Sequence, residues 1–227
     1  MNRITLLQLD THFPRIPGDV GSVDTYKCEL EIIRVPNATV EQVVNANPSQ
    51  IDLDPFYDAI DKATGDLVTT SCGFLSPFQN ELDMACNVPF IASSLGQLEY
   101  LKNIYKPSEL QIITFDASKL GAAHLPEGCE DFAGSIYGLN FNAHLRNVIE
   151  NNIKHLDTVK VATDVCTVIE KNNNKLVKSI LLECTNLPPY KSEIRRISNV
   201  PVYDILTAIE NKLPNSVHEY FLYGNLK

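Results

Sequence analysis

The sequence lacks clusters of basic residues and long apolar runs. Its 19 Lys and Arg residues against 28 Asp and Glu residues give a net charge of −9, and the nearest approach to a basic cluster is Arg195-Arg196. Nucleic-acid binding needs clustered Lys and Arg. The apolar run at residues 4–9 is too short for a signal-peptide core or a membrane span. We therefore expect a soluble, cytoplasmic protein with neither nucleic acid nor membrane as a partner.

Cys-x-x-Cys pairs are also missing, although the chain has six cysteines. They are scattered through a chain with enough apolar residues to build a core, so neither a disulfide framework nor a zinc site is indicated. We expect six reduced thiols, with no metal and no cofactor. Most of them should be buried structural residues. The cysteines lie at positions 28, 72, 86, 129, 166 and 184.

Short β-branched runs alternate with helical stretches, which is typical of an α/β fold with mainly parallel sheets. Most of the runs are apolar without alternation, as expected of strands covered on both faces. Strands are predicted at residues 4–9, 28–35, 67–71, 88–92, 110–115, 135–139, 179–183 and 200–203. Helices are predicted at residues 55–64, 75–86, 96–105, 142–153, 156–171, 189–197 and 205–212.

An internal repeat relates the two halves of the chain. A strand leads into Cys72, and Asn-Val-Pro follows fifteen residues later; the same pattern surrounds Cys184, so both marks are offset by 112 residues (72 to 184 and 87 to 199). The repeat predicts two pseudo-symmetric lobes that face each other across an active-site cleft. We place residues 1–106 and 205–227 in the first lobe and residues 107–204 in the second.

The two repeated cysteines stand at strand ends, where open parallel sheets bind their ligands. Each precedes a predicted helix start, a position that favours a thiolate. Thiols that approach one carbon from opposite sides could remove a proton from one face and return one to the other. This arrangement predicts racemisation at a carbon next to a carboxylate, with Cys72 and Cys184 as acid and base.

Three segments resemble the aspartate/glutamate racemase family. They are Asp-Thr-His-Phe-Pro-Arg-Ile-Pro-Gly-Asp at residues 10–19, Thr-Thr-Ser-Cys-Gly-Phe at residues 69–74 and Leu-Glu-Cys-Thr-Asn at residues 182–186. The resemblance implies cofactor-independent racemisation of a small anionic amino acid, aspartate or glutamate, in a homodimer. Glutamate racemases typically have Cys-Asn-Thr where this chain has Cys-Gly-Phe, and Gly-Cys-Thr-His where it has Glu-Cys-Thr-Asn.

Other polar residues near the strand ends are candidates for substrate binding. Arg15 lies in a loop stiffened by two prolines, which suits a carboxylate clamp. Glu183 should point away from its neighbour's side if strand alternation continues, as a structural or supporting group. The complete set expected to bind substrate is Asp10, Arg15, Ser71, Gly73, Phe74, Thr114, Ser118, Thr185 and Asn186.

Three alternatives remain open from the sequence. The same fold could carry a different reaction, such as that of a hydantoin racemase or a maleate-type cis-trans isomerase. One thiol could instead be the nucleophile of a Cys–His hydrolase, which requires a histidine beside it. The third alternative is a non-catalytic protein that binds small anions.

Overall fold

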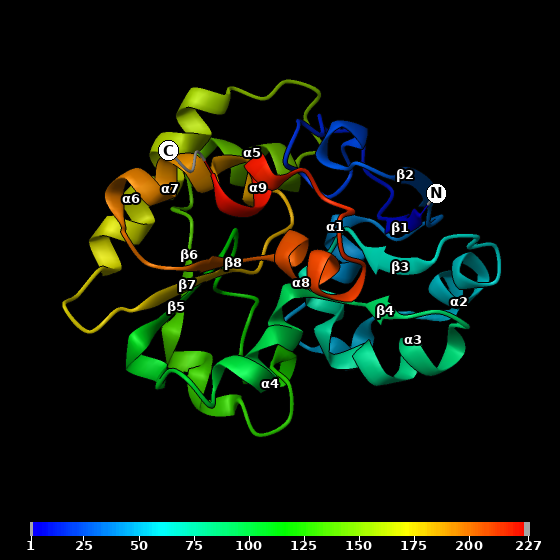
Figure 1. The fold of residues 1–227 in the computed structure, drawn as a ribbon, viewed down its shortest axis with the longest axis horizontal. Coiled ribbons are helices and arrows are strands. Elements are labelled where there is room, and N and C mark those ends of the chain that lie inside the picture. Colours follow the sequence, from blue (N-terminus) through cyan, green and yellow to red (C-terminus); the bar gives the residue numbers. More distant parts are fainter. Residues whose placement is uncertain (1, 225–227) are drawn as a thin grey trace.

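The computed structural model describes residues 2–224 and contains two four-stranded parallel sheets. The sheets lie on opposite sides of the molecule in Figure 1. The first has the order β2-β1-β3-β4 and the second β6-β5-β7-β8. The strands are β1 Arg3–Gln8, β2 Glu29–Arg34, β3 Leu67–Thr70, β4 Phe90–Ile91, β5 Leu110–Thr114, β6 Ile136–Gly138, β7 Ser179–Leu182 and β8 Val202–Tyr203.

The two sheets repeat one topology, which confirms the predicted α/β class with two similar lobes. In each lobe, the first strand pairs with the second on one side and with the third on the other. Strands β3 and β7 occupy matching positions, and each leads toward one of the two repeated cysteines. Both strands are completely buried, because helices cover them as expected of parallel strands.

The helices are α1 Val40–Val43, α2 Asp54–Ile60, α3 Gln79–Ala85, α4 Leu98–Leu101, α5 His144–Glu150, α6 Thr158–Asn172, α7 Lys191–Ile197, α8 Ile205–Lys212 and α9 Glu219–Tyr223. Within residues 2–224, none is long and apolar enough to cross a membrane. Helix α6 shows how the sequence specifies them: Asp157 caps its first turn through the backbone N–H of Lys160, and its buried valines recur every three or four residues.

Several predicted helices are shorter than expected, and some of them begin as 3-10 helices with a shortened α-helix behind them. The segment at residues 75–86 begins as the 3-10 helix Gly73–Phe78, which contains Pro77, and α3 starts only at Gln79. A proline inside a helix cannot donate the backbone hydrogen bond of a regular α-helical turn. The segment predicted at residues 96–105 likewise begins as the 3-10 helix Ser94–Gln97 and continues as the four-residue α4.

The apolar core joins the two sheets. One buried cluster includes Leu7 of β1 and Ile112 of β5, so it is continuous from one lobe to the other. A second cluster packs Ile4 and Leu6 against Ile205 and other residues of α8. Helix α8 follows the second sheet in the sequence yet packs on the first. The predicted residue limits of the lobes stay a prediction.

Candidate active site

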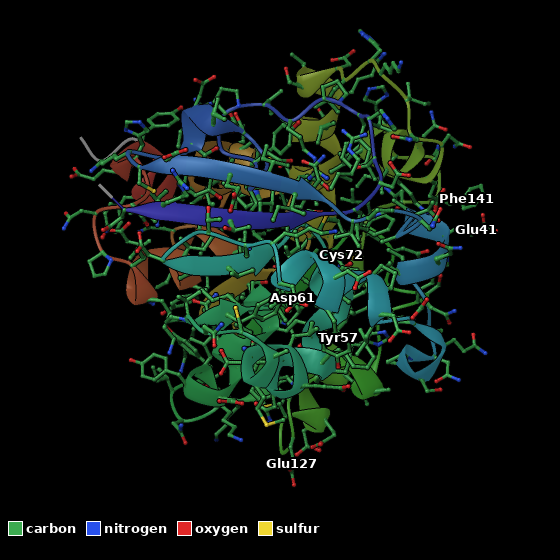
Figure 2. The ribbon with its side chains drawn as sticks, turned by 90° about the vertical axis from the view of Figure 1, so that its right-hand side faces the viewer. Glu41, Tyr57, Asp61, Cys72, Glu127 and Phe141 are labelled. Carbon is green, nitrogen blue, oxygen red and sulfur yellow. The ribbon has the colours of Figure 1, made fainter. Side chains whose placement is uncertain are left out.

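Cys72 and Cys184 line the same pocket, and each lies two residues beyond the carboxyl end of its strand. Figure 2 shows Cys72 where the chain leaves the cyan strand β3. Both side chains are buried, and neither cysteine forms a disulfide. The Thr185 hydroxyl donates a hydrogen bond to the Ser71 carbonyl at 2.8 Å, which ties the two cysteine-bearing loops together across the lobes.

The electrostatic environment of both thiols favours the neutral form. Burial, and then the Glu183 carboxylate, raise the pKa of Cys72 to about 12, although the backbone N–H of Phe74 and the Arg15 guanidinium oppose the rise. The pKa of Cys184 is raised well above its usual value by burial and by the same carboxylate. The expected lowering by a helix start was therefore wrong for both thiols, because desolvation is the larger effect.

Glu183 is a buried carboxyl group that also lines the pocket. Its exposed fraction is 1%, and neither oxygen has a hydrogen-bond partner among residues 2–224. Burial raises its pKa to about 7, and the nearby Thr114 hydroxyl opposes this rise. Continued strand alternation would have turned Glu183 away from the pocket. The alternation does not apply to Glu183, because β7 ends one residue before it, at Leu182.

Gly73 gives this carboxyl group its space. A Cβ atom built at residue 73 would overlap both the carboxyl group and the backbone carbonyl of Glu183. Any larger residue would displace either the Cys72 loop or the Glu183 side chain. The position of the Glu183 carboxyl group therefore depends on glycine at residue 73, where the glutamate-racemase pattern has a different residue.

Arg15 supplies the positive charge of the pocket. Its Nη1 lies 3.1 Å from Asp19 Oδ1, and its Nη2 donates to the Thr11 hydroxyl at 3.2 Å. The Nε donor is buried and has no partner within the described chain. The guanidinium also stacks 4.5 Å from the centre of the Phe13 ring. Arg15 is thus held rigidly while keeping a donor for a ligand carboxylate.

A polar chain connects this guanidinium to the second thiol. Asn186 Nδ2 donates to Asp19 Oδ2 at 2.6 Å, and the Cys184 thiol donates to Asn186 Oδ1 at 3.6 Å. The loop that carries Arg15 and Asp19 passes close to the second lobe at Gly18, whose φ is +98°. A Cβ atom there would lie 2.8 Å from the Pro189 backbone, so glycine permits both the turn and the close approach.

Eight of the predicted site residues come together in the pocket. They are Cys72, Cys184, Arg15, Ser71, Gly73, Phe74, Thr185 and Asn186. Their roles in catalysis or binding stay a prediction. The sequence did not single out Thr11 or Asp19, or the apolar walls formed by Leu9, Phe13, Val40, Val44, Phe115 and Ile149. Asp19 is the last residue of the 10–19 segment that carries the resemblance to racemases, and that segment was the sequence signal for it.

Three residues expected to bind substrate lie outside the pocket. Asp10 is at the surface, 3.7 Å from Arg34, and Ser118 donates to Asp116 Oδ1 at 2.6 Å in a local turn. Thr114 is buried beside Glu183. These residues follow or end strands as predicted, and none of the three lines the pocket, so their expected contact with substrate stays a prediction.

The described residues also bear on two alternative kinds of site. No histidine is among the pocket-lining residues in the part of the chain that the structure covers, so a Cys–His pair is not formed there. His124 instead packs edge-to-face against Phe74 and places its Nε2 2.9 Å from the Asn45 carbonyl oxygen. Between residues 2 and 224, no group of three or more His, Cys, Asp or Glu side chains is arranged to hold a metal ion.

No family model matches the chain. Among curated proteins, it is 28% identical over 230 residues to a dimethylsulfoniopropionate lyase of Durusdinium sp. clade D, covering 90% of this chain and 72% of that protein. It is 27% identical over 229 residues to dimethylsulfoniopropionate lyase 3 of Emiliania huxleyi, covering 92% of this chain and 58% of that protein. The chain therefore spans only part of these relatives.

Solved structures share the fold at lower sequence identity. The allantoin racemase of Pseudomonas fluorescens superposes with a TM-score of 0.60 at 15% identity, over 99% of this chain and 98% of its own. The aspartate racemase of Picrophilus torridus gives a TM-score of 0.56 at 13% identity, over 98% of this chain and all of its own. The fold of this chain resembles that of these racemases.

The relatives overturn the expected reaction. The prediction of an amino-acid racemase was wrong, because the curated proteins that match most of this sequence are named as lyases. The resemblance to racemases identified the fold correctly, whereas the curated relatives are named as lyases. Both kinds of relative are enzymes, and the comparisons indicate that this chain is an enzyme with a racemase-like fold.

Proposed function

We propose that the chain is a lyase that cleaves the carbon–sulfur bond of a small sulfonium carboxylate of the dimethylsulfoniopropionate class. The names of the curated relatives support the class of reaction. The observation that carries the proposal is the placement of two thiols and one guanidinium around a single pocket. This set of groups can hold a carboxylate and accept a proton from the adjacent carbon.

The reaction is a β-elimination that balances without an oxidant, a reductant or a second reactant. Dimethylsulfoniopropionate joins a carboxylate to a cationic dimethylsulfonium group through two methylene carbons. A base removes one proton from the carbon next to the carboxylate, and that electron pair forms a carbon–carbon double bond. The carbon–sulfur bond breaks with its electrons going to sulfur, which releases neutral dimethyl sulfide and acrylate.

In this scheme, Arg15 binds the carboxylate and one of the two cysteines, as a thiolate, is the base. Hydrogen bonds from the guanidinium stabilise the charge that develops on the carboxylate as the proton leaves. Only one thiol needs to ionise, since elimination removes a proton without returning one to carbon. The Coulombic effect of Cys72 on Cys184 raises the pKa of the latter, which favours one thiolate beside one thiol.

The test is direct measurement of both products from the purified chain. With dimethylsulfoniopropionate, we expect dimethyl sulfide in the headspace by gas chromatography and an equal amount of acrylate by proton NMR. Loss of the thiol that acts as base, in Cys72→Ser or Cys184→Ser, should lower kcat by about 100-fold or more, the usual contribution of a general base.

Cys129→Ser is the matched control, because Cys129 is equally buried and does not line the pocket. Its turnover should stay within about threefold of the parent, the scatter expected of a change away from the site. The lyase proposal fails if the folded parent releases no dimethyl sulfide. The role of the thiols fails if both pocket variants keep full turnover.

A further inference from the structure

The pocket contains one anionic group more than its cations can neutralise. Arg15 is the only basic residue among the described residues that line it, and Arg15 is already paired with Asp19 at 3.1 Å. Glu183 has no such partner: among residues 2–224 neither of its oxygens accepts a hydrogen bond, and no guanidinium or ammonium group acts on its pKa. Its neighbours are the two thiols and the Thr114 hydroxyl.

Burying an unpaired carboxylate destabilises the folded protein, yet the backbone around Glu183 leaves space for its carboxyl group. Desolvation of a carboxylate without a compensating charge opposes ionisation. The absence of a side chain at Gly73 is what lets the carboxyl group occupy its position. A ligand that carries a positive charge into the pocket would supply the missing partner and stabilise the ionised form.

We propose that Glu183 is the counter-ion for the cationic end of a zwitterionic substrate, so that the pocket selects small carboxylates bearing a methylated onium group over carboxylates of the same shape that lack the positive charge. This inference rests on the proposed function for the identity of the substrate. The carboxylate end binds Arg15, and the onium end is placed at Glu183. The two charged ends of the ligand thus match the two charged groups of the pocket.

The remaining walls suit a methylated cation rather than a hydrated ammonium group. Aliphatic side chains of Leu9, Val40, Val44 and Ile149 line the pocket together with the rings of Phe74 and Phe115. Apolar and aromatic surfaces accommodate onium methyl groups, and the ring faces attract the positive charge. A sulfonium or quaternary ammonium group has no N–H donor, so Glu183 acts through charge alone.

Binding of the onium group would also assist the base. The Glu183 carboxylate is the second-largest cause of the raised pKa of each thiol, after burial. A cation beside Glu183 offsets that effect and attracts a thiolate directly. The substrate therefore brings the positive charge that makes its own deprotonation easier, whereas a carboxylate without an onium group does not.

The experiment compares two ligands of nearly the same shape that cannot undergo elimination. Dimethylsulfonioacetate has no hydrogen on a carbon β to sulfur, and 3-methylbutanoate replaces its cationic sulfur by CH. By titration calorimetry at pH 8, we expect the native chain to bind the cationic ligand at least about tenfold more tightly, a difference of about 1.4 kcal/mol. In Glu183→Gln, the two dissociation constants should become equal within about threefold.

Glu127→Gln is the control for net charge, because it makes the same substitution at an exposed carboxylate outside the pocket and should keep the tenfold preference. A second readout needs no variant. Because the pKa of Glu183 is about 7, the group is mostly protonated at pH 6, and a cation should expel that proton. The calorimetric heat should then depend on the buffer for dimethylsulfonioacetate and not for 3-methylbutanoate.

The counter-ion role is overturned if Glu183→Gln keeps the full preference, or if the native chain shows neither a preference nor proton release. These results are separable from those for the lyase. Dimethyl sulfide release with an unchanged ligand preference in Glu183→Gln overturns only the counter-ion. A Glu183-dependent preference without dimethyl sulfide release supports the counter-ion and overturns only the lyase.

Discussion

Replacing Arg15 by glutamine should affect stability and substrate binding through different partners. The guanidinium holds Asp19, whose side chain is 3% exposed, and also carries the free donor expected to bind the substrate carboxylate. In Arg15→Gln, Asp19 becomes a buried carboxylate without a cation. Breaking a buried pair in this way typically costs about 3–5 kcal/mol, which in a domain of this size lowers Tm by about 6–20 °C.

The double variant Arg15→Gln/Asp19→Asn separates the two effects. In the native chain, the backbone N–H of Gly21 and the Asn186 amide donate to the two Asp19 carboxylate oxygens at 2.8 and 2.6 Å. In the double variant, these two donors compete for the one amide oxygen at position 19. The remaining cost should be one lost hydrogen bond, about 1–3 kcal/mol. The double variant should therefore be more stable than Arg15→Gln alone, by circular dichroism during urea or thermal unfolding.

The partial recovery of stability in the double variant should not be accompanied by a recovery of its activity. Loss of one or two charge-assisted hydrogen bonds to the carboxylate, worth about 1.5–3 kcal/mol each, predicts that kcat/KM falls by at least about 10-fold in both variants. Recovery of kcat/KM in the double variant would show that Arg15 serves only to neutralise Asp19. Equal stability of the single and double variants would refute the energetic coupling of the pair.

Two further measurements test the electrostatics. Burial raises the pKa of Cys72 to about 12 and that of Cys184 above its usual value, so only a small fraction of either thiol is ionised at neutral pH. The thiolate fraction, and hence kcat/KM for elimination, should therefore rise about tenfold per pH unit between pH 7 and 9. A pH profile of kcat/KM that is flat over this range contradicts a thiolate base of raised pKa. Lys191→Met should lower the free energy of unfolding by about 3–5 kcal/mol, because Lys191 Nζ lies 2.6 Å from fully buried Asp204. Urea unfolding should show partial recovery in Lys191→Met/Asp204→Asn, and equal stabilities of the two variants would show that the pair is not coupled.

The strands and the two repeated thiols could be predicted from sequence because they depend on local patterns. Apolar runs without alternation specify buried parallel strands, and the matched spacing around Cys72 and Cys184 reflects a duplicated unit. Helices α1 and α9 were not predicted, since elements of four and five residues have too little periodicity to recognise.

The details of the site depend on tertiary contacts that no local pattern reports. Asp10 and Ser118 look like candidates for binding because they lie at or just beyond the strand ends, yet Asp10 faces Arg34 and Ser118 caps a turn through Asp116. Glu183 was expected to point away because alternation was extended past the end of β7. Its position depends on the space above Gly73, which belongs to the other lobe.

The reaction itself was not predictable from the thiols. Racemisation and β-elimination both begin when a base removes a proton from the carbon next to a carboxylate, so a pocket with a guanidinium and two thiols suits either one. The outcomes differ only after that step: a carbanion without a leaving group is reprotonated, whereas one with a sulfonium group on the next carbon expels it. The proposed lyase would select its substrate through a residue that recognises the charge of the leaving group, and Glu183 is the unpaired carboxyl group among the described residues of the pocket at which that recognition would occur.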